Sequence, residues 1–142
     1  MGLARQHSML VAIGFACTLT ACFRSSADAT ESDKTRAHER CAKDPEYQEK
    51  ESDDAERRLD KYCSDHDCPG RGKIAALCVF RSNKAQSGAS YEVETTIAPG
   101  DSTTEQQVCT TIRKASAYPF FGVIEVYCKN DKRCMTCGGG GR

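Results

Sequence analysis

The pattern of apolar and polar residues divides this chain into three regions. An uncharged apolar run extends from Met9 to Leu19, and more than half of residues 31–61 are then charged, with both signs interleaved. After residue 73 the chain contains short segments rich in β-branched and aromatic residues, separated by turn residues. The pattern therefore predicts an apolar leader, a charged helical segment and a module that contains strands.

The charged region has the features of two helices, near residues 32–42 and 45–62. Asp44-Pro45 is typical of a helix start, because proline is favoured at the first helical position. Acidic residues precede basic ones by four positions, as in Glu46 and Lys50, and this order stabilises a helix. Apolar positions are few, so we expect these helices to pack lightly against the rest of the protein.

The later region predicts a small sheet that carries one helix. Its expected segments are strands at 73–81, 91–97 and 121–128 and a helix at 102–117. Ser102 followed by Glu105 is the pattern of a capping box. The first strand segment would also suit a short helix. The predicted fold class is α+β: residues 32–137 form a single small domain, in which a small antiparallel sheet with one packed helix follows the charged helical segment, and residues 138–142 form a flexible glycine-rich tail.

The apolar leader is too short to cross a membrane. Its run of about 11 residues compares with the roughly 20 that a transmembrane helix needs. Arg5 precedes the run, and no acidic residue occurs before Asp28. A basic start, an apolar centre and small residues before the cut are the parts of an export signal, which the mature protein loses. Residues 1–21 are therefore predicted to be a signal peptide.

The leader ends in Leu19-Thr20-Ala21-Cys22, which resembles the lipobox of bacterial lipoproteins. The resemblance implies cleavage before Cys22, a diacylglyceryl group on its sulfur and an acylated amine. Cys22 would then anchor the chain to a membrane, with residues 22–31 as a flexible tether. Phe23 in place of Asp favours the outer over the inner membrane where both exist. The alternative is ordinary cleavage without lipid, either after Ala27-Asp28-Ala29 or after the small residues before Cys22.

Ten cysteines are unusually many for a chain of this length. Cys17 would leave with the signal and Cys22 would carry the lipid. An even number in an exported chain predicts a disulfide framework. The eight that remain for it are Cys41, Cys63, Cys68, Cys78, Cys109, Cys128, Cys134 and Cys137.

Helix geometry restricts how these cysteines pair. An unbroken second helix would place Cys41 and Cys63 about 25 Å apart at about 1.5 Å per residue, so they would not be partners. Cys109 would face the sheet from its helix, with Cys78 or Cys128 as its partner. The cysteines that flank this module, and that would fasten the helical segment and the tail to it, are Cys63, Cys68, Cys134 and Cys137.

The cysteines also suggest two kinds of chemistry. Cys134-Met-Thr-Cys137 has the spacing of a redox pair, but no strand precedes it and no helix follows it, so a structural role is favoured. A zinc site is the other possibility, with four thiolates and a nearby histidine. Its ligands would come from Cys63, Cys68, Cys134 and Cys137, with His66 nearby. Cysteines of an exported chain usually oxidise before they meet zinc, so no metal site is predicted.

The remaining polar candidates have simpler interpretations. Asp65-His66-Asp67 would serve as a metal site or a base, but a solvated loop is the favoured reading. Glu92, Glu94 and Glu125 lie on predicted strands, and paired carboxylates serve glycosidases that place them across a cleft. A chain of this size without tryptophan makes that role unfavoured. The sequence contains no P-loop and no Ser-His-Asp constellation that we can place.

The charge balance completes the sequence prediction. Removal of residues 1–21 removes Arg5 and no acidic residue, which leaves 19 basic and 20 acidic side chains. A nearly neutral chain has no strong overall electrostatic field to attract nucleic acid, so no nucleic-acid partner is expected.

We predict a non-catalytic envelope lipoprotein that faces the periplasm or exterior, binds the membrane through Cys22, has no cofactor and has a possible envelope protein partner. The alternative is a thiol-redox or zinc protein using Cys134 and Cys137, and a third option is a small hydrolase or an inhibitor of one.

Overall fold

A computed structural model describes residues 26–81, 89–115, 124–130 and 132–137. The predicted signal peptide, Cys22 and the tail from residue 138 lie outside these residues. The elements in chain order are helices α1 (Glu31–Cys41) and α2 (Glu49–Asp65), a short 3-10 helix (Arg71–Lys73), strands β1 (Ile74–Arg81) and β2 (Ala89–Thr95), helix α3 (Ser102–Ala115), and strands β3 (Ile124–Cys128) and β4 (Lys132–Cys137).

The four strands form one mixed sheet in the order β1-β2-β3-β4. The α+β class is confirmed, and a helix or strand lies in each predicted segment, although positions 116–117 and 121–123 of these segments lie outside the described residues. The antiparallel prediction is wrong for one pair, because β2 and β3 run parallel. Helix α3 lies between them in the chain, and such a crossover returns the chain to the same end of the sheet. Strand β4, which pairs antiparallel with β3, was not predicted.

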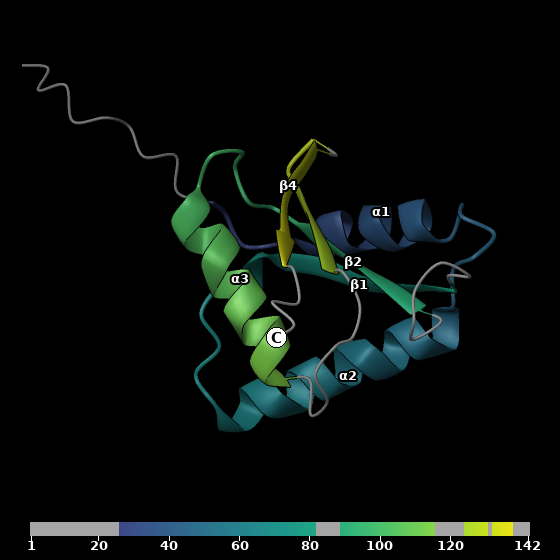
Figure 1. Ribbon diagram of the computed structural model, residues 1–142, viewed down its shortest axis with the longest axis horizontal. Coiled ribbons are helices and arrows are strands. Elements are labelled where there is room, and N and C mark those ends of the chain that lie inside the picture. Colours follow the sequence, from purple (N-terminus) through teal and green to yellow (C-terminus); the bar gives the residue numbers. More distant parts are fainter. Residues whose placement is uncertain (1–25, 82–88, 116–123, 131, 138–142) are drawn as a thin grey trace, which may run out of the picture.

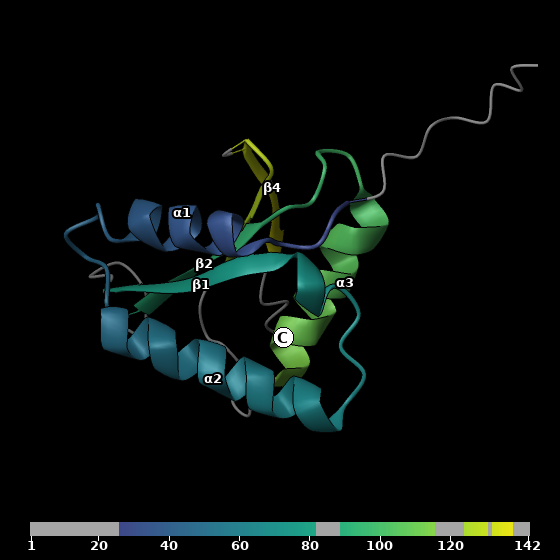
Figure 2. The ribbon, with the colours of Figure 1, turned by 180° about the vertical axis from the view of Figure 1, so that it is seen from behind.

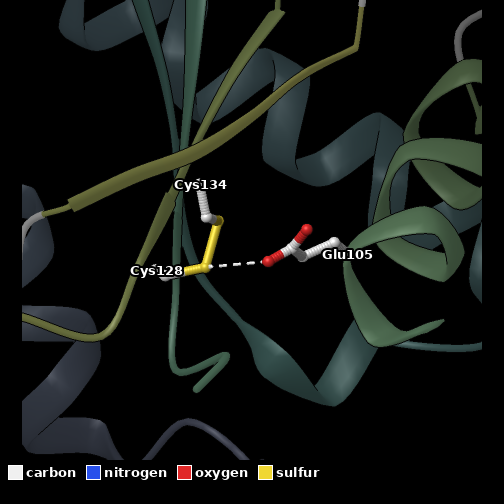
Figure 3. A group of neighbouring side chains, drawn as sticks. All are labelled: Glu105, Cys128 and Cys134. Carbon is white, nitrogen blue, oxygen red and sulfur yellow. Dashed lines mark hydrogen bonds between the residues drawn. A yellow bond between two sulfur atoms is a disulfide. The ribbon is translucent and has the colours of Figure 1, made fainter. Parts of the chain in front are cut away.

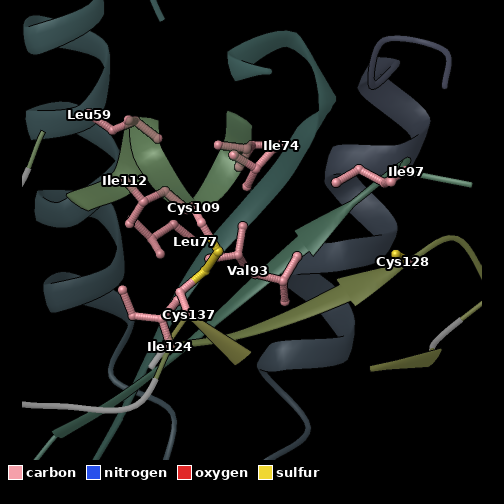
Figure 4. Close-up of a cluster of buried hydrophobic side chains, with 12 residues drawn as sticks. Leu59, Ile74, Leu77, Val93, Ile97, Cys109, Ile112, Ile124, Cys128 and Cys137 are labelled. Atoms are coloured by element: carbon pink, nitrogen blue, oxygen red, sulfur yellow. A yellow bond between two sulfur atoms is a disulfide. The ribbon is translucent and has the colours of Figure 1, made fainter. Parts of the chain in front are cut away.

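The sheet is the middle layer of the domain. Figures 1 and 2 show α1 on one face and α2 and α3 on the other. The apolar core lies on the α2 and α3 side, where Leu59, Ile112 and Val93 are each at most 2% exposed (Figure 4). A smaller buried cluster lies on the α1 side. Its residues are Ala37, Cys41, Ala75, Ala76, Cys78 and Phe80.

Helix α2 begins later than predicted because the chain before it pairs with the sheet. The backbone N–H of Gln48 donates to the Val79 carbonyl at 2.8 Å, and Tyr47 forms a bridge with Phe80. Within α2, the Ser52 hydroxyl accepts from the Val79 N–H at 2.9 Å. The outer edge of β1 is therefore covered by α2 and the residues before it, which protects an edge strand from pairing with other chains.

Part of the predicted tether lies against the domain instead. Ser26 is 5% exposed, donates to the Asp101 carboxylate at 2.8 Å and accepts from the Ala98 N–H at 3.1 Å. The Ala29 N–H donates to the Gly72 carbonyl at 2.7 Å. Thr30 then caps α1 in a reciprocal capping box with its third residue. Residues 26–30 thus belong to the folded domain, and residues 22–25 lie outside the described part of the chain.

Candidate functional site

The eight cysteines of the described residues form four disulfides, as the cysteine count predicts. The pairs and their Cα separations are Cys41–Cys78 at 6.3 Å, Cys63–Cys68 at 5.5 Å, Cys109–Cys137 at 5.7 Å and Cys128–Cys134 at 5.6 Å. The prediction that Cys41 and Cys63 are not partners is confirmed. The partner predicted for Cys109 is wrong: strand β4, absent from the predicted sheet, brings Cys137 to α3.

Cys134 and Cys137 both lie on β4 and are bonded to different partners. An extended strand separates residues three apart by about 10 Å, which is beyond the reach of a disulfide. The C-x-x-C motif is therefore not a disulfide of its own in this structure.

A bulge in β4 determines where Cys134 points. Val126 pairs with Met135 and Tyr127 pairs with Arg133, so Cys134 is the extra residue without a partner in the ladder. Such an insertion redirects a side chain and occurs often beside functional sites. Here it lets the Cys134 sulfur reach Cys128, at the end of β3.

A buried carboxyl group lies against this disulfide (Figure 3). One oxygen of Glu105, on the first turn of α3, is 3.7 Å from the Cys128 sulfur. The ligand atoms of Glu105, Cys128 and Cys134 all lie within 4.8 Å of one another. Glu105 is 8% exposed and Cys128 is 2% exposed, while Cys134 is half-buried. We call these three residues the Glu105 site.

Glu105 faces inward because another residue caps the helix. Asp101 accepts from the Thr104 N–H at 3.1 Å and from the Thr104 hydroxyl at 2.6 Å. The predicted capping box of Ser102 and Glu105 is therefore wrong. Asp101 caps the start of the helix, so Glu105 is its fourth residue instead of its third, and its carboxyl is buried beside the Cys128 sulfur.

Burial raises the pKa of the Glu105 carboxyl, and the neighbouring Asp101 carboxylate raises it further. A hydrogen bond with the Gly100 backbone opposes both effects. A disulfide sulfur carries no proton, so the contact with Cys128 is a hydrogen bond only when Glu105 is protonated and donates. The site thus places a carboxyl group of raised pKa beside two disulfide-bonded sulfurs, which would be ligands of the kind that zinc binds only as thiolates.

The three strand glutamates lie on the opposite face of the sheet, beside α1. Glu94 is buried and forms an ion pair with Arg40 of α1. Glu125 forms an ion pair with Arg133 at 3.0 Å. Burial raises the pKa of the Glu92 carboxyl, and its register partner Glu125 adds to the shift. These carboxylates lie side by side on one surface and two are held by arginines, an arrangement that does not match a pair placed across a cleft.

A groove of about 350 Å³ lies between α3 and the loop that follows α2. The Thr111 hydroxyl donates to the Pro69 carbonyl at 2.8 Å and joins the helix to the loop after α2. The groove is lined by Asp67, Pro69, Ser102, Thr103, Gln106, Gln107, Thr110, Thr111 and Lys114. We call it the α3 groove. Sequence reasoning missed it because its hydroxyl and amide side chains have the pattern of an ordinary exposed helix face.

The histidine and cysteine set suggested for zinc is not brought together. Cys63 and Cys68 are bonded to each other, and His66 stacks on Tyr62 with ring centroids 4.1 Å apart. The His66 ring also bonds the Tyr62 carbonyl at 2.9 Å and so closes the end of α2. Within the described residues, the Glu105 site is the one group of three metal-binding side chains.

Comparison with known proteins adds no family. The chain matches no protein-family model, no curated protein and no solved structure. Among the described residues, none of the helices combines the length and the apolar character that spanning a membrane requires. The structure itself defines the chain as a small α+β domain with four disulfides and a Glu-Cys-Cys cluster.

Proposed function

We propose that this protein is a lipid-anchored module of a bacterial cell envelope with a binding or structural role that is not catalytic. The observation that carries the proposal is the complete pairing of the eight described cysteines. Disulfides form and persist outside the reducing cytosol. Of the ten cysteines, only Cys17 and Cys22 lie outside the described residues, and these are the two that the leader assigns to the signal and to the lipid.

Residues 26–30 pack against the domain, so only a short segment would separate it from an anchor at Cys22. Ser26 is fixed to Asp101 at the start of α3, four positions after Cys22. Four residues span at most about 14 Å even when fully extended. A lipid on Cys22 would therefore hold the beginning of α3 close to the membrane surface, whereas a flexible tether to residue 31 would allow many orientations.

The α3 groove is the surface that best suits a binding role. Ser102 and Thr103 place one end of the groove at the part of the domain that the anchor would hold near the membrane. Hydroxyl and amide groups both donate and accept hydrogen bonds, as a peptide backbone does. The groove therefore fits a polar segment of another envelope protein.

Metabolic labelling tests the anchor. The full chain is expressed in a bacterium that is fed radiolabelled palmitate, and label is expected in the wild type. Cys22→Ala abolishes labelling, while the matched variant Cys17→Ala keeps it, because Cys17 precedes the cut. Absence of label from the wild type, or equal label in Cys22→Ala, would contradict the proposal.

Fluorescence tests the orientation. A donor dye is attached at Thr103, at the start of α3, or at Lys50, at the start of α2 on the opposite side of the domain in Figures 1 and 2. With an acceptor on lipid headgroups, transfer is expected to be greater from position 103 than from position 50. Equal transfer from a palmitate-labelled protein would refute the orientation but not the anchor.

A further inference from the structure

The Glu105 site contains an acid whose charge is poorly compensated. Glutamate is seldom buried unless it is paired. Burial and the like-charged Asp101 both disfavour the charged form of this carboxyl, and a hydrogen bond from the Gly100 backbone favours it. A cation bound between Glu105 and the adjacent sulfurs would be stabilised by the same charge that is now costly to bury.

The distances at the site are close to those of a tetrahedral zinc centre. Zinc binds sulfur at about 2.3 Å and carboxylate oxygen at about 2.0–2.2 Å, which places neighbouring ligand atoms about 3.5–3.8 Å apart. The Glu105 oxygen and the Cys128 sulfur are already 3.7 Å apart. If the disulfide opened, the two sulfurs would need to separate to about 3.8 Å. Their Cα atoms, 5.6 Å apart, allow this by side-chain rotation.

The backbone holds these side chains together without the disulfide. Cys128 pairs with Lys132, and the β4 bulge aims the Cys134 side chain at the site. The Cys109–Cys137 disulfide independently fastens the end of β4 to α3, which carries Glu105. The three ligands therefore stay close when the Cys128–Cys134 bond is broken.

We infer that reduction of the Cys128–Cys134 disulfide opens a zinc site made by Glu105, Cys128 and Cys134. A dithiol supplies the two electrons: its two sulfurs become a disulfide, its two protons pass to Cys128 and Cys134, and the bond between these cysteines breaks. Zn²⁺ then binds the two sulfurs as thiolates and releases two protons to water. The Glu105 carboxylate is the third ligand and water is the fourth.

This inference does not depend on membrane attachment. It also differs from the zinc set suggested by the sequence, because Cys63, Cys68 and Cys137 take no part. Under oxidising conditions the Cys128–Cys134 disulfide links β3 to β4, and under reducing conditions the two cysteines bind zinc. A redox change therefore alters both the metal content and the β3–β4 connection.

Exposure determines which disulfides a dithiol opens first. Cys41, Cys78 and Cys109 are each at most 6% exposed, whereas Cys134 is half-buried and more accessible. Cys63 and Cys68 are also half-buried. The experiment therefore uses the full chain with Cys63→Ser and Cys68→Ser, so that Cys128–Cys134 is the accessible bond that remains. Alkylation with peptide mass mapping identifies the bond that opens.

The probe is zinc chloride, added after the dithiol is removed without air. Native mass spectrometry counts the bound metal, competition with a chromophoric chelator gives the Kd, and cobalt(II) absorption reports sulfur ligation. The reduced protein is expected to bind a single zinc ion and the oxidised protein none. Glu105→Gln should weaken binding by about tenfold or more, since even outer-shell changes have effects of that size. Cys134→Ser should abolish tight binding.

The matched control is Glu125→Gln, on β3 but on the opposite face of the sheet, which should leave the Kd unchanged. Several results would overturn the inference: zinc bound equally by the oxidised protein, an unchanged Kd in Glu105→Gln, or tight binding retained in Cys134→Ser. Circular dichroism and resistance to protease check the fold of the reduced protein. Unfolding on reduction of this one bond would also overturn the inference, because the site requires the hairpin to hold the thiols.

Discussion

The two faces of the sheet are held to their helices in different ways. On the α2 and α3 face, large apolar side chains such as Val93, Ile112 and Leu59 form a continuous core. On the α1 face, the helix buries only Ala37 and Cys41. The first face holds its helices by apolar burial, and the second face has little apolar area with which to hold α1.

A covalent bond and an ion pair compensate for this difference. The Cys41–Cys78 disulfide joins the end of α1 to β1 across 37 positions of sequence. Arg40, the residue before Cys41, forms an ion pair with the buried Glu94 of β2. The comparison indicates that a helix of very polar sequence can be fixed to a sheet when a disulfide replaces the apolar contact.

The largest expected effect comes from removal of this disulfide. A closed loop of 37 residues corresponds to about 4 kcal/mol of stabilisation by the chain-entropy relation. Cys41→Ala with Cys78→Ala should lower the free energy of unfolding by about that amount and expose α1 amides to hydrogen exchange. Urea unfolding and exchange measurements check both results.

The matched control for that variant is Cys63→Ser with Cys68→Ser. Its loop of 5 residues corresponds to about 2 kcal/mol by the same relation. An equal loss of stability in the two variants, or full protection of α1 without Cys41–Cys78, would show that α1 does not depend on its disulfide.

Truncation in the apolar core should weaken the other face. Ile112 is 2% exposed in the core, so Ile112→Ala should cost about 3 kcal/mol by loss of burial and creation of a cavity. Hydrogen exchange should then speed up in α3 and β3 before α1. Exposed Thr110→Ala, on the same helix, is the control and should change the unfolding free energy by less than about 0.5 kcal/mol. Faster exchange in α1 alone would contradict the division between the faces.

The Arg40–Glu94 ion pair should stabilise the folded protein less than the Cys41–Cys78 disulfide or the burial of Ile112, because Arg40 is partly exposed. Removal of one partner leaves a buried carboxylate without its charge partner, so Arg40→Met should cost about 2 kcal/mol. The double variant with Glu94→Leu should recover most of this loss, since no unpaired charge remains. Thermal unfolding of the single and double variants measures the coupling, and a double variant as unstable as Arg40→Met would argue against the ion pair.

The smallest effect concerns the pH dependence that Glu105 adds to the core face. Its pKa is raised in the folded protein, so the folded state binds the proton more tightly than the unfolded state. Its favourable contribution is present below the unfolded pKa and is lost as the pH rises through the folded pKa. Glu105→Gln should therefore be more stable than the wild type at neutral pH, and this advantage should disappear in acid. Parallel pH titrations of unfolding check the sign, and a variant that gains relative stability in acid would refute it.

Periodicity and composition predicted the class and most elements, but not their connections. The alternation of Tyr91, Val93, Thr95 and Ile97 and the apolar stripe of α3 are local signals, and the structure confirms a helix there and a strand that ends at Thr95. Strand β4 has no such signal, because Lys132 and Arg133 precede two cysteines, a methionine and a threonine. Only its pairing with β3 makes it a strand, and that contact is not local in sequence.

The Glu105 site was not predictable for the same reason. It requires Asp101 to take the cap from Ser102, and a bulge to turn Cys134 toward α3. Neither follows from spacing. The count of cysteines, in contrast, was sufficient to predict a disulfide framework, although it did not predict which sulfurs meet.

The lipid anchor at Cys22 and the four disulfides are tested most directly by the intact mass of the protein recovered from bacterial membranes. This mass is measured with and without alkylation under denaturing conditions. We predict that the eight cysteines from Cys41 to Cys137 resist alkylation before reduction, and that digestion yields linked peptides for Cys41–Cys78 and Cys109–Cys137. The peptide that begins at Cys22 should carry the mass of its acyl chains. A protein whose eight cysteines all react without reduction, and whose Cys22 is unmodified, would contradict the account.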